Sequence, residues 1–219
     1  MNRSLLTEVD EAERAADLSY VQAEIPKAFE QTLDGVDRVA KIVRSMKEFS
    51  HVDQSSDQSP ADLNRALENH AGGCAQRAEI CRKRRNGFGE LPQVICHLGD
   101  MNQVFLNLLV NAAHAIGDVV KKTGAKGAIR VRTRQVGDEA EIAISDTGTG
   151  IPYGIREKIF EPFFTTKEVG KGTGQGLALA RVIVVEKHGG KLTFDSEIGK
   201  GTTFYIRLPL AGVKESITV

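Results

Sequence analysis

The chain has 219 residues and a mass of 23.8 kDa, and its 29 Lys and Arg residues balance its 29 Asp and Glu residues. Hydrophobic residues make up 41% of the sequence, enough to build a core, which excludes a largely disordered chain. A neutral chain lacks the basic surplus that binding to a phosphate backbone requires, so we expect no nucleic-acid partner. No apolar run approaches the roughly 18 residues of a membrane span, and we recognise no signal peptide.

The cysteines Cys74, Cys81 and Cys96 are an odd and scattered set. They fit neither a disulfide framework nor a CxxC metal site, and idle thiols of this kind are typical of a reducing compartment. We therefore expect a cytoplasmic location for this chain, whether the full-length protein is soluble or anchored to a membrane.

Apolar residues recur every three or four positions between Val21 and Ser50, which predicts a long amphipathic helix with Pro26 near its start. The apolar stripe consists of Ile25, Phe29, Leu33, Val36, Ala40, Val43 and Met46. A lone helix cannot bury so broad a face, so it needs a partner helix, although packing on its own globular domain is an alternative. We expect residues 1–52 to be part of a helical hairpin or dimer stalk.

A linker is expected over residues 53–60, which are rich in Ser, Asp and Gln and end in Pro. A globular domain is expected over 61–211 and a tail over 212–219. Within the domain the patterns predict helices over 61–71, 100–116, 155–160 and 174–187, and strands over 128–135, 140–145, 191–196 and 202–208. The pattern of 75–90, which holds a basic run, defines no secondary structure. The order of elements predicts an α/β two-layer sandwich with helices on one face of a mixed sheet.

A polar stripe is cut into the predicted helix over 100–116. Asn107, Asn111 and His114 fall within roughly 60° of one another at 100° per residue. Burying such groups costs free energy unless something binds them. Amide oxygens suit a Mg²⁺ ion that shares its remaining positions with phosphates, and His114 could donate to a phosphate oxygen. Alternatively, the stripe faces solvent or the amides cap internal turns.

The sequence Asp-Thr-Gly-Thr-Gly-Ile-Pro at 146–152 directly follows an apolar strand. A carboxylate at a strand end can accept a hydrogen bond from the exocyclic amine of adenine, whereas guanine presents an acceptor there. Gly148 and Gly150 would let the backbone approach a flat ring. An ordinary turn is the alternative; an aspartic protease would need a second such Asp in an all-β fold, which the pattern does not support.

A second glycine-rich segment, Gly-Lys-Gly-Thr-Gly-Gln-Gly at 170–176, begins a predicted helix. Backbone N–H groups at a helix start form an anion site, and the glycine density suggests a lid that closes on a nucleotide. The spacing is that of neither a Walker loop nor a Rossmann fingerprint. A flexible surface loop is the alternative.

In order, the motifs NLLVNA, DTGTGI, FEPFFTTK, GTGQGLAL and GTTFYIRLP resemble the catalytic ATP-binding domain of sensor histidine kinases, which has the Bergerat fold shared with gyrase, chaperone and mismatch-repair ATPases. The resemblance covers about residues 60–210, and the helix over 21–50 resembles the second helix of the dimerisation and phosphotransfer hairpin. It implies ATP and Mg²⁺ as cofactors. It also implies that Asn111 coordinates Mg²⁺ with assistance from Asn107, and that His114 contacts a phosphate.

The resemblance further implies that Asp146 selects adenine in a pocket shaped by Gly148 and Gly150. It implies that Lys167 and Lys171 lie near the phosphates. The remaining residues that it assigns to nucleotide binding or the lid are Ile151, Gly172, Thr173, Gly174, Gly176, Leu177 and Thr202. Phe160, Phe163 and Phe164 resemble the aromatic motif beside the lid, although phenylalanines next to a loop are also typical of packing.

A hydrolytic relative would carry a glutamate base where this chain has Asn107, which cannot take a proton; this favours phosphotransfer over hydrolysis. The family's phosphoacceptor is a histidine on the first hairpin helix, followed by an acidic residue and then a proline. The five histidines are His51, His70, His97, His114 and His188, and none lies in such a motif. We therefore expect a fragment, or an acceptor on another chain.

The expected function is ATP-dependent phosphotransfer to a histidine that this chain does not contain. The expected partners are the phosphoacceptor helix, a response-regulator receiver domain and, in the full-length protein, a second copy in a homodimer. A Bergerat-fold ATPase, a serine kinase of the anti-sigma type and an inactive nucleotide-binding module remain alternatives.

Overall fold

The computed structural model describes residues 17–51, 58–73, 81–167 and 172–212. The chain divides into two compact units, Met1–Lys47 and Glu48–Val219. Residues 53–57 of the expected linker, Cys74 and Lys171 lie outside the described residues.

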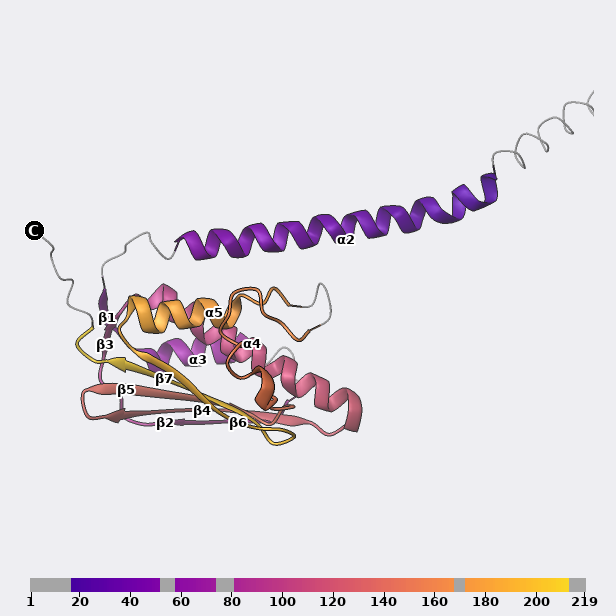
Figure 1. Cartoon of the computed structure of the whole chain (residues 1–219). Helices are drawn as coiled ribbons and strands as arrows, with labels where there is room; N and C mark the ends of the chain where they lie inside the picture. The colour runs from indigo at the N-terminus through magenta and orange to yellow at the C-terminus, as the bar shows by residue number, and fades with distance from the viewer. Residues whose placement is uncertain (1–16, 52–57, 74–80, 168–171, 213–219) are drawn as a thin grey trace, which may run out of the picture. The chain divides into compact units, whose positions relative to one another are not determined.

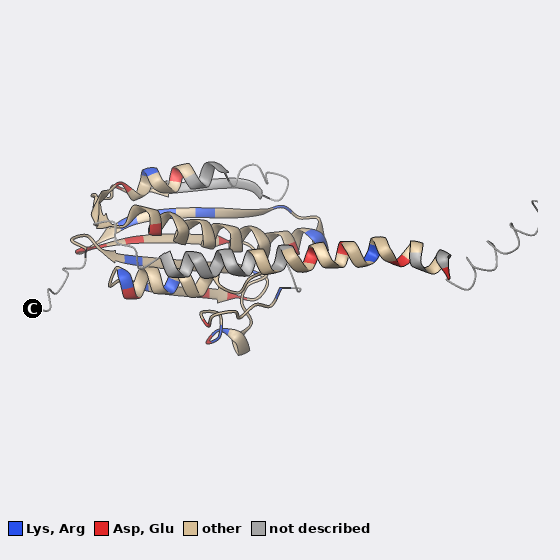
Figure 2. Ribbon diagram, turned by 90° about the horizontal axis from the view of Figure 1, so that it is seen from above, with Lys and Arg blue, Asp and Glu red and all other residues tan. Residues whose placement is uncertain are grey.

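Helix α2 spans Leu18–His51 and contains Pro26, which confirms the long N-terminal helix (Figure 1). Ile25, Phe29, Leu33 and Val36 follow one another at steps of three and four, and their side chains are between 48% and 67% exposed. Acidic and basic residues are interspersed along the helix in Figure 2. Within its own unit, the helix therefore presents an exposed apolar stripe along one side.

The second unit is built on a five-stranded mixed sheet in the order β2-β4-β5-β7-β6. Its strands are β2 (Cys81–Phe88), β4 (Gly127–Val136), β5 (Glu139–Asp146), β6 (Lys191–Glu197) and β7 (Gly201–Pro209). β2 runs parallel to β4, and every other pair is antiparallel. Two short strands, β1 (Ser59–Ala61) and β3 (Val94–Cys96), form a separate antiparallel pair.

The two faces of the sheet follow from period-two alternation along the strands. One face is apolar and buried under the helices, and it carries Ile129, Val131, Ile142, Ile144, Leu192, Phe204, Ile206 and Leu208. On the opposite face the cross-strand neighbours Arg134, Glu141 and Arg207 form an ion-pair network, in which the two arginine Nε atoms donate to the Glu141 carboxylate at 2.6 and 2.8 Å. Hydrogen bonds from Arg134 and then Arg207 hold the pKa of the buried Glu141 carboxyl below its ordinary value.

Three helical segments cover the apolar face: α3 (Leu63–Gly73), α4 (Leu98–Thr123) and α5 (Gly176–Arg181), which continues as the π-helix η3 (Val182–Lys187) (Figure 1). Helix α4 is the core of the domain, because Met101, Val104, Phe105 and Leu108 are almost completely buried. This helix meets the length and hydropathy criteria for a membrane span, as core helices of soluble domains also do. The predicted two-layer α/β sandwich, preceded by a long helix, is confirmed.

Several elements differ from those predicted. The strands β1, β2 and β3 were not predicted, because two have three residues and the third contains the basic run Arg82–Arg85. The helix expected over 155–160 is a short 3₁₀ helix, η2 (Tyr153–Ile155), followed by turns. The helix expected over 174–187 begins at Gly176 and changes to a π-helix at Val182.

Candidate functional site

The polar stripe of α4 lies beside the segment that precedes the glycine-rich loop. The Lys167 ammonium donates to Asn111 Oδ1 at 3.1 Å and lies 2.8 Å from His114 Nδ1. Burial lowers the pKa of Lys167 below its ordinary value, although the charge of Asp118 opposes this effect. The structure thus brings together three residues that the sequence places up to 56 positions apart.

Asn107, one turn before Asn111, connects α4 to the start of α5. Its Nδ2 donates to the Gly176 carbonyl oxygen at 3.1 Å, and its Oδ1 accepts a hydrogen bond from Gln103 Nε2 at 3.3 Å. A side chain on Gly176 would stand against Asn107, its Cβ 3.5 Å from Asn107 Cγ. The side chain of Asn107 therefore fixes the end of the glycine-rich segment 170–176 against α4.

Asp146, the last residue of β5, is buried with 9% of its surface exposed. The Gly148 amide donates to its Oδ1 at 2.7 Å, and the Thr202 backbone amide also donates to the carboxylate. Burial nevertheless raises the pKa of Asp146 to about 6. A buried carboxyl with this pKa is a strong candidate for ligand recognition.

Tight contacts bring the loop after Asp146 against α4 and β7. A Cβ on Gly148 would overlap Ala115 of α4, at 2.6 Å from its carbonyl carbon, so only glycine allows this approach. Gly150 has φ of 73°, and a Cβ there would overlap the backbone of Glu197. Gly201 has φ of 114°, and a Cβ there would overlap the carbonyl group of Asp146. The loop therefore reaches α4 one turn beyond Asn111.

The described part of the glycine-rich segment, 172–176, packs against residues 163–167. Gly174 adopts φ of 67° directly against the Phe163 backbone, and Phe163 itself has φ of 67°. Gly172 lies against the side chains of Thr165 and Lys167, and Leu177 packs on the core. Thr173 accepts a hydrogen bond of 3.4 Å from the Gln175 amide. Three segments therefore approach one face of α4: the loop after Asp146, residues 163–167 and the end of the glycine-rich segment. The residues that they contact there are Asn107, Asn111, His114 and Ala115.

Residues 98–212 match the family model described as histidine kinase-, DNA gyrase B-, and HSP90-like ATPase. The chain belongs to this ATPase family. Among curated relatives, sensor kinase CckA of Brucella abortus (strain 2308) is 47% identical over 128 residues, and histidine-protein kinase AtoS of Escherichia coli (strain K12) is 35% identical over 184 residues. The solved catalytic domain of histidine kinase ThkA is 26% identical, with a TM-score of 0.60 over 71% of this chain and 97% of that one.

The matches cover different shares of these proteins. They span 55% of this chain and 13% of CckA, and 81% of this chain and 28% of AtoS. This chain thus corresponds to less than a third of either relative. The family model covers residues 98–212 of this chain, and the solved catalytic domain of ThkA covers 71% of it.

A divalent metal ion in this ATPase domain would take some of its ligands from the protein and the others from a nucleotide. Among the described residues, no group of three or more His, Cys, Asp or Glu side chains is placed to hold a metal ion. Asn111 Oδ1 already accepts from a cation, the Lys167 ammonium, so its oxygen lies where positive charge is favoured. An amide oxygen beside bound phosphates fits Mg²⁺, which commonly takes one or two protein ligands and keeps its other positions for water and phosphate.

Ser196 is a site residue that the sequence did not indicate. Its hydroxyl accepts from the Ile151 amide at 2.7 Å and lies 3.0 Å from Thr202 Oγ1. Arg156 donates to the carbonyl oxygens of Ser196 and Ile151. No local sequence signal marks Ser196, because its place opposite Thr202 is set by the pairing of β6 with β7. These contacts hold the loop after Asp146 onto β6 and β7.

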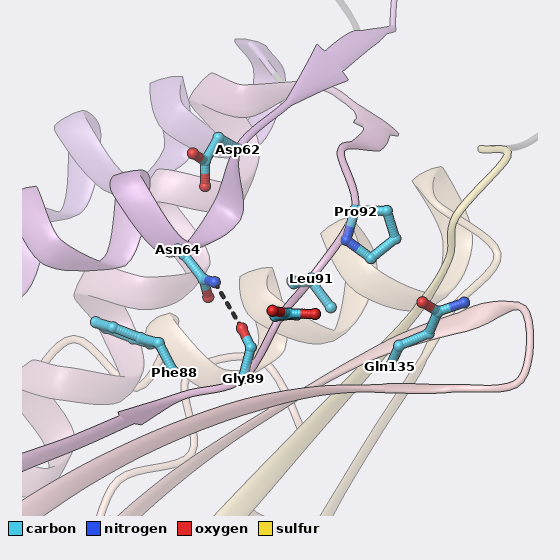
Figure 3. A pocket seen from close by; sticks show the side chains of 8 residues that line it. Asp62, Asn64, Phe88, Gly89, Leu91, Pro92 and Gln135 are labelled. Carbon is cyan, nitrogen blue, oxygen red and sulfur yellow. Dashed lines mark hydrogen bonds between the residues drawn. The ribbon is translucent and has the colours of Figure 1, made fainter.

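A separate hollow of about 590 Å³ lies among α3, the end of β2 and the following loop, and it contains none of the predicted site residues (Figure 3). Its polar groups are used to hold the fold. Asn64 donates to the Gly89 carbonyl oxygen at 3.0 Å and accepts from Thr133 at 2.7 Å, while Asp62 caps the start of α3. We therefore assign the functional site to the face of α4.

Proposed function

We propose that this chain is the ATP-binding catalytic region of a sensor histidine kinase, which binds Mg²⁺-ATP and transfers its γ-phosphoryl group to a histidine outside the residues given. The observation that carries this proposal is the approach of the Asp146 loop, Lys167 and Gly176 to one face of α4. The catalytic ATPase family of the domain and the kinase names of its relatives support it.

Asp146 would recognise the adenine ring. Its buried carboxylate can accept from the exocyclic amine, and guanine would instead place an acceptor oxygen against it. Gly148, Gly150, Ile151 and Thr202 would form the walls, because they surround Asp146 or fix its loop through Ser196. Adenine rather than guanine nucleotides are therefore the expected ligands.

The α4 stripe would hold the phosphates. Asn111 supplies an amide oxygen to Mg²⁺, which would neutralise charge on the transferring phosphoryl group. Lys167 and His114 would donate to phosphate oxygens, and Lys167 would leave Asn111 to do so. Asn107 would assist by holding Gly176. The lid would consist of Gly172, Thr173, Gly174, Gly176 and Leu177. Lys171, which lies outside the described residues, would also contact a phosphate.

Transfer to a side chain is favoured over hydrolysis. A hydrolytic site needs a base to activate water, and the equivalent position here is Asn107, whose amide cannot accept a proton. Its Nδ2 and Oδ1 are both engaged in hydrogen bonds within the domain. The site therefore positions a phosphoryl group without activating water.

The acceptor and partners are further parts of the proposal. We propose that residues 1–52 belong to the dimerisation and phosphotransfer hairpin, that 53–60 form the linker, 61–211 the catalytic domain and 212–219 a tail. The exposed stripe of α2 supports a partner helix and a homodimer of the full-length protein. ThkA has been solved in complex with the response regulator protein TrrA, and we propose a receiver domain as the downstream partner in the cytoplasm.

Labelled ATP tests this function directly. We expect the chain to transfer γ-phosphate label to an isolated phosphoacceptor helix of a sensor histidine kinase, and the label to be acid-labile and base-stable. Asp146→Ala should abolish ATP binding in calorimetry, whereas Asn111→Ala should mainly remove Mg²⁺-dependent transfer. Label on serine would identify an anti-sigma type of kinase instead, and equal ATP affinity of Asp146→Ala and the parent would refute the assigned pocket.

A further inference from the structure

His188, at the end of the π-helix, is a buried titratable residue outside the proposed nucleotide site. Only 2% of its surface is exposed. Its Nδ1 lies 2.7 Å from the Ile183 carbonyl oxygen, and its Nε2 lies 3.0 Å from the backbone nitrogen of His97, the residue that precedes α4. The imidazole therefore joins the end of the π-helix to the residue before α4, which lies 91 positions earlier in the sequence.

The two partners determine the tautomer of this imidazole. A carbonyl oxygen can only accept, so Nδ1 must carry the proton that is donated to Ile183. A backbone N–H can only donate, so Nε2 must be unprotonated to accept from His97. The bridge thus exists only in the neutral Nδ1–H form of the ring.

The environment favours this neutral form. Burial is the largest effect that lowers the pKa of His188 below its ordinary value, and the charges of His97 and Lys187 act in the same direction. The bond to Ile183 and the charge of Asp100 oppose it. Lys187 also forms an ion pair of 2.6 Å with Asp100 on the first turn of α4, so the two segments are joined at a second point.

These contacts join the C-terminal end of the α5–η3 segment to α4, and the N-terminal end of the same segment is joined to α4 as well. At the other end, Asn107 Nδ2 donates to the Gly176 carbonyl oxygen at the start of α5. The end of the π-helix is itself held, because the Gly190 amide donates to Val184 at 2.8 Å and a Cβ on Gly190 would overlap the Arg207 carbonyl oxygen on β7. His188 therefore adds a connection between the N-terminal end of α4 and the sheet, beside the direct packing of α4 on the strands.

We propose that His188 is a positioning residue, which fixes the N-terminal end of α4 on the π-helix and thereby places Asn107 and Asn111 for binding of the metal-nucleotide. This inference rests on the proposed function, since it gives His188 a role in the same site. π-helical turns are rare, and those that occur frequently lie at functional sites. Loss of a side chain that orients a metal ligand commonly weakens metal binding or activity. This positioning role does not require His188 to contact the nucleotide.

Two substitutions separate the halves of the bridge. In His188→Gln the amide oxygen can reach the position of Nε2 and accept from His97, whereas in His188→Asn the amide nitrogen can reach the position of Nδ1 and donate only to Ile183. With the whole chain in calorimetry, we expect His188→Asn to weaken Mg²⁺-ATP binding about tenfold. His188→Gln should keep the affinity of the parent, and ATP without Mg²⁺ should bind all three proteins alike.

The outcomes distinguish this inference from the function on which it rests. If the parent binds no ATP, the proposed function fails. If the parent binds Mg²⁺-ATP and His188→Asn binds it equally well, the positioning role is wrong. Equal losses in both variants with and without Mg²⁺ would also overturn it, because a general loss of structure has no selectivity for the metal complex.

Nitrogen NMR of the parent provides a readout that does not depend on the variants. The His188 ring should show a protonated Nδ1 and an unprotonated Nε2 at neutral pH, with a scalar coupling from the His97 amide across the hydrogen bond to Nε2. An Nε2–H tautomer, or a His97 amide that exchanges rapidly with solvent, would contradict the bridge.

Discussion

At the scale of single residues, Asp146 shows how a recognition group is maintained at a cost in stability. A buried carboxyl with a pKa of about 6 binds a proton more tightly in the folded chain than in the unfolded chain, where its ordinary value is 3.8. Proton binding therefore favours the folded state below about pH 4, and this contribution is lost as the pH rises through 6. At neutral pH the ionised carboxylate is buried at a cost, which binding of an adenine amine can offset.

Asp146→Asn should consequently stabilise the nucleotide-free chain at pH 7.5 by about 2 kcal/mol, because the neutral amide avoids burial of a charge. Urea unfolding, followed by circular dichroism at pH 4 and pH 7.5, would measure the difference in free energy of unfolding between this variant and the parent. The stabilisation should nearly vanish at pH 4. Asp138→Asn, in the exposed turn after β4, is the matched control, because it makes the same substitution at an exposed position. A stabilisation equal at both pH values would contradict the raised pKa.

At the scale of elements, the close approach of the Asp146 loop to α4 depends on one missing side chain. A Cβ on Gly148 would lie 2.6 Å from the Ala115 carbonyl carbon and 2.8 Å from Asp146 Oδ1. We expect Gly148→Ala to displace the loop, to lower the free energy of unfolding by about 1–3 kcal/mol and to weaken ATP binding.

Gly99→Ala, in the first turn of the same helix, is the control for this change, because nothing lies within 4 Å of its Cβ position. It should leave ATP binding unchanged and raise the free energy of unfolding by about 0.4–1 kcal/mol. Thermal unfolding and calorimetry of both variants would measure these effects. An unchanged ATP affinity of Gly148→Ala would show that the loop does not form the pocket wall.

The elements that the sequence predicted well are those whose local pattern agrees with their environment. β4 to β7 alternate because one face packs under helices, and α4 carries an apolar face of 3.6-residue period. β2 could not be predicted, since its parallel pairing with β4 is a long-range contact and its basic residues resemble a solvated surface. The π-helix could not be predicted either, because its register depends on packing rather than on periodicity.

The site was partly predictable for a similar reason. The stripe of Asn107, Asn111 and His114 is a property of one helix, and Asp146 marks the end of one strand, so both leave a local signal. The roles of Ser196 and His188 depend on pairing with segments far along the chain, at Ile151 and His97. No local pattern distinguishes such residues from ordinary polar ones.

At the scale of the whole molecule, the apolar stripe of α2 should drive association. Burying a Phe or Leu side chain is worth about 1.5–3 kcal/mol, so removing one from an interface should weaken the complex by about tenfold or more. We expect the chain to show concentration-dependent dimerisation in analytical ultracentrifugation. Phe29→Gln and Leu33→Gln should each raise the dissociation constant of the dimer, so that it forms only at higher protein concentration.

Asp34→Asn is the matched control for these two changes, since 100° per residue places Asp34 on the opposite side of α2. It should leave the dimerisation constant unchanged. A chain that stays monomeric at all accessible concentrations, or that is unaffected by the loss of Phe29, would show that this stripe does not associate with a second copy.

The strand order also determines when this domain can be completed during synthesis. Among the described residues β7 is the last strand along the sequence, yet it lies between β5 and β6 in the sheet. The backbone amide of its Thr202 donates to Asp146. While residues 201–209 are still inside the ribosome, β5 has an unpaired edge and its carboxylate lacks one of its donors. ATP binding therefore cannot stabilise the fold of a nascent chain until translation has passed beyond this strand.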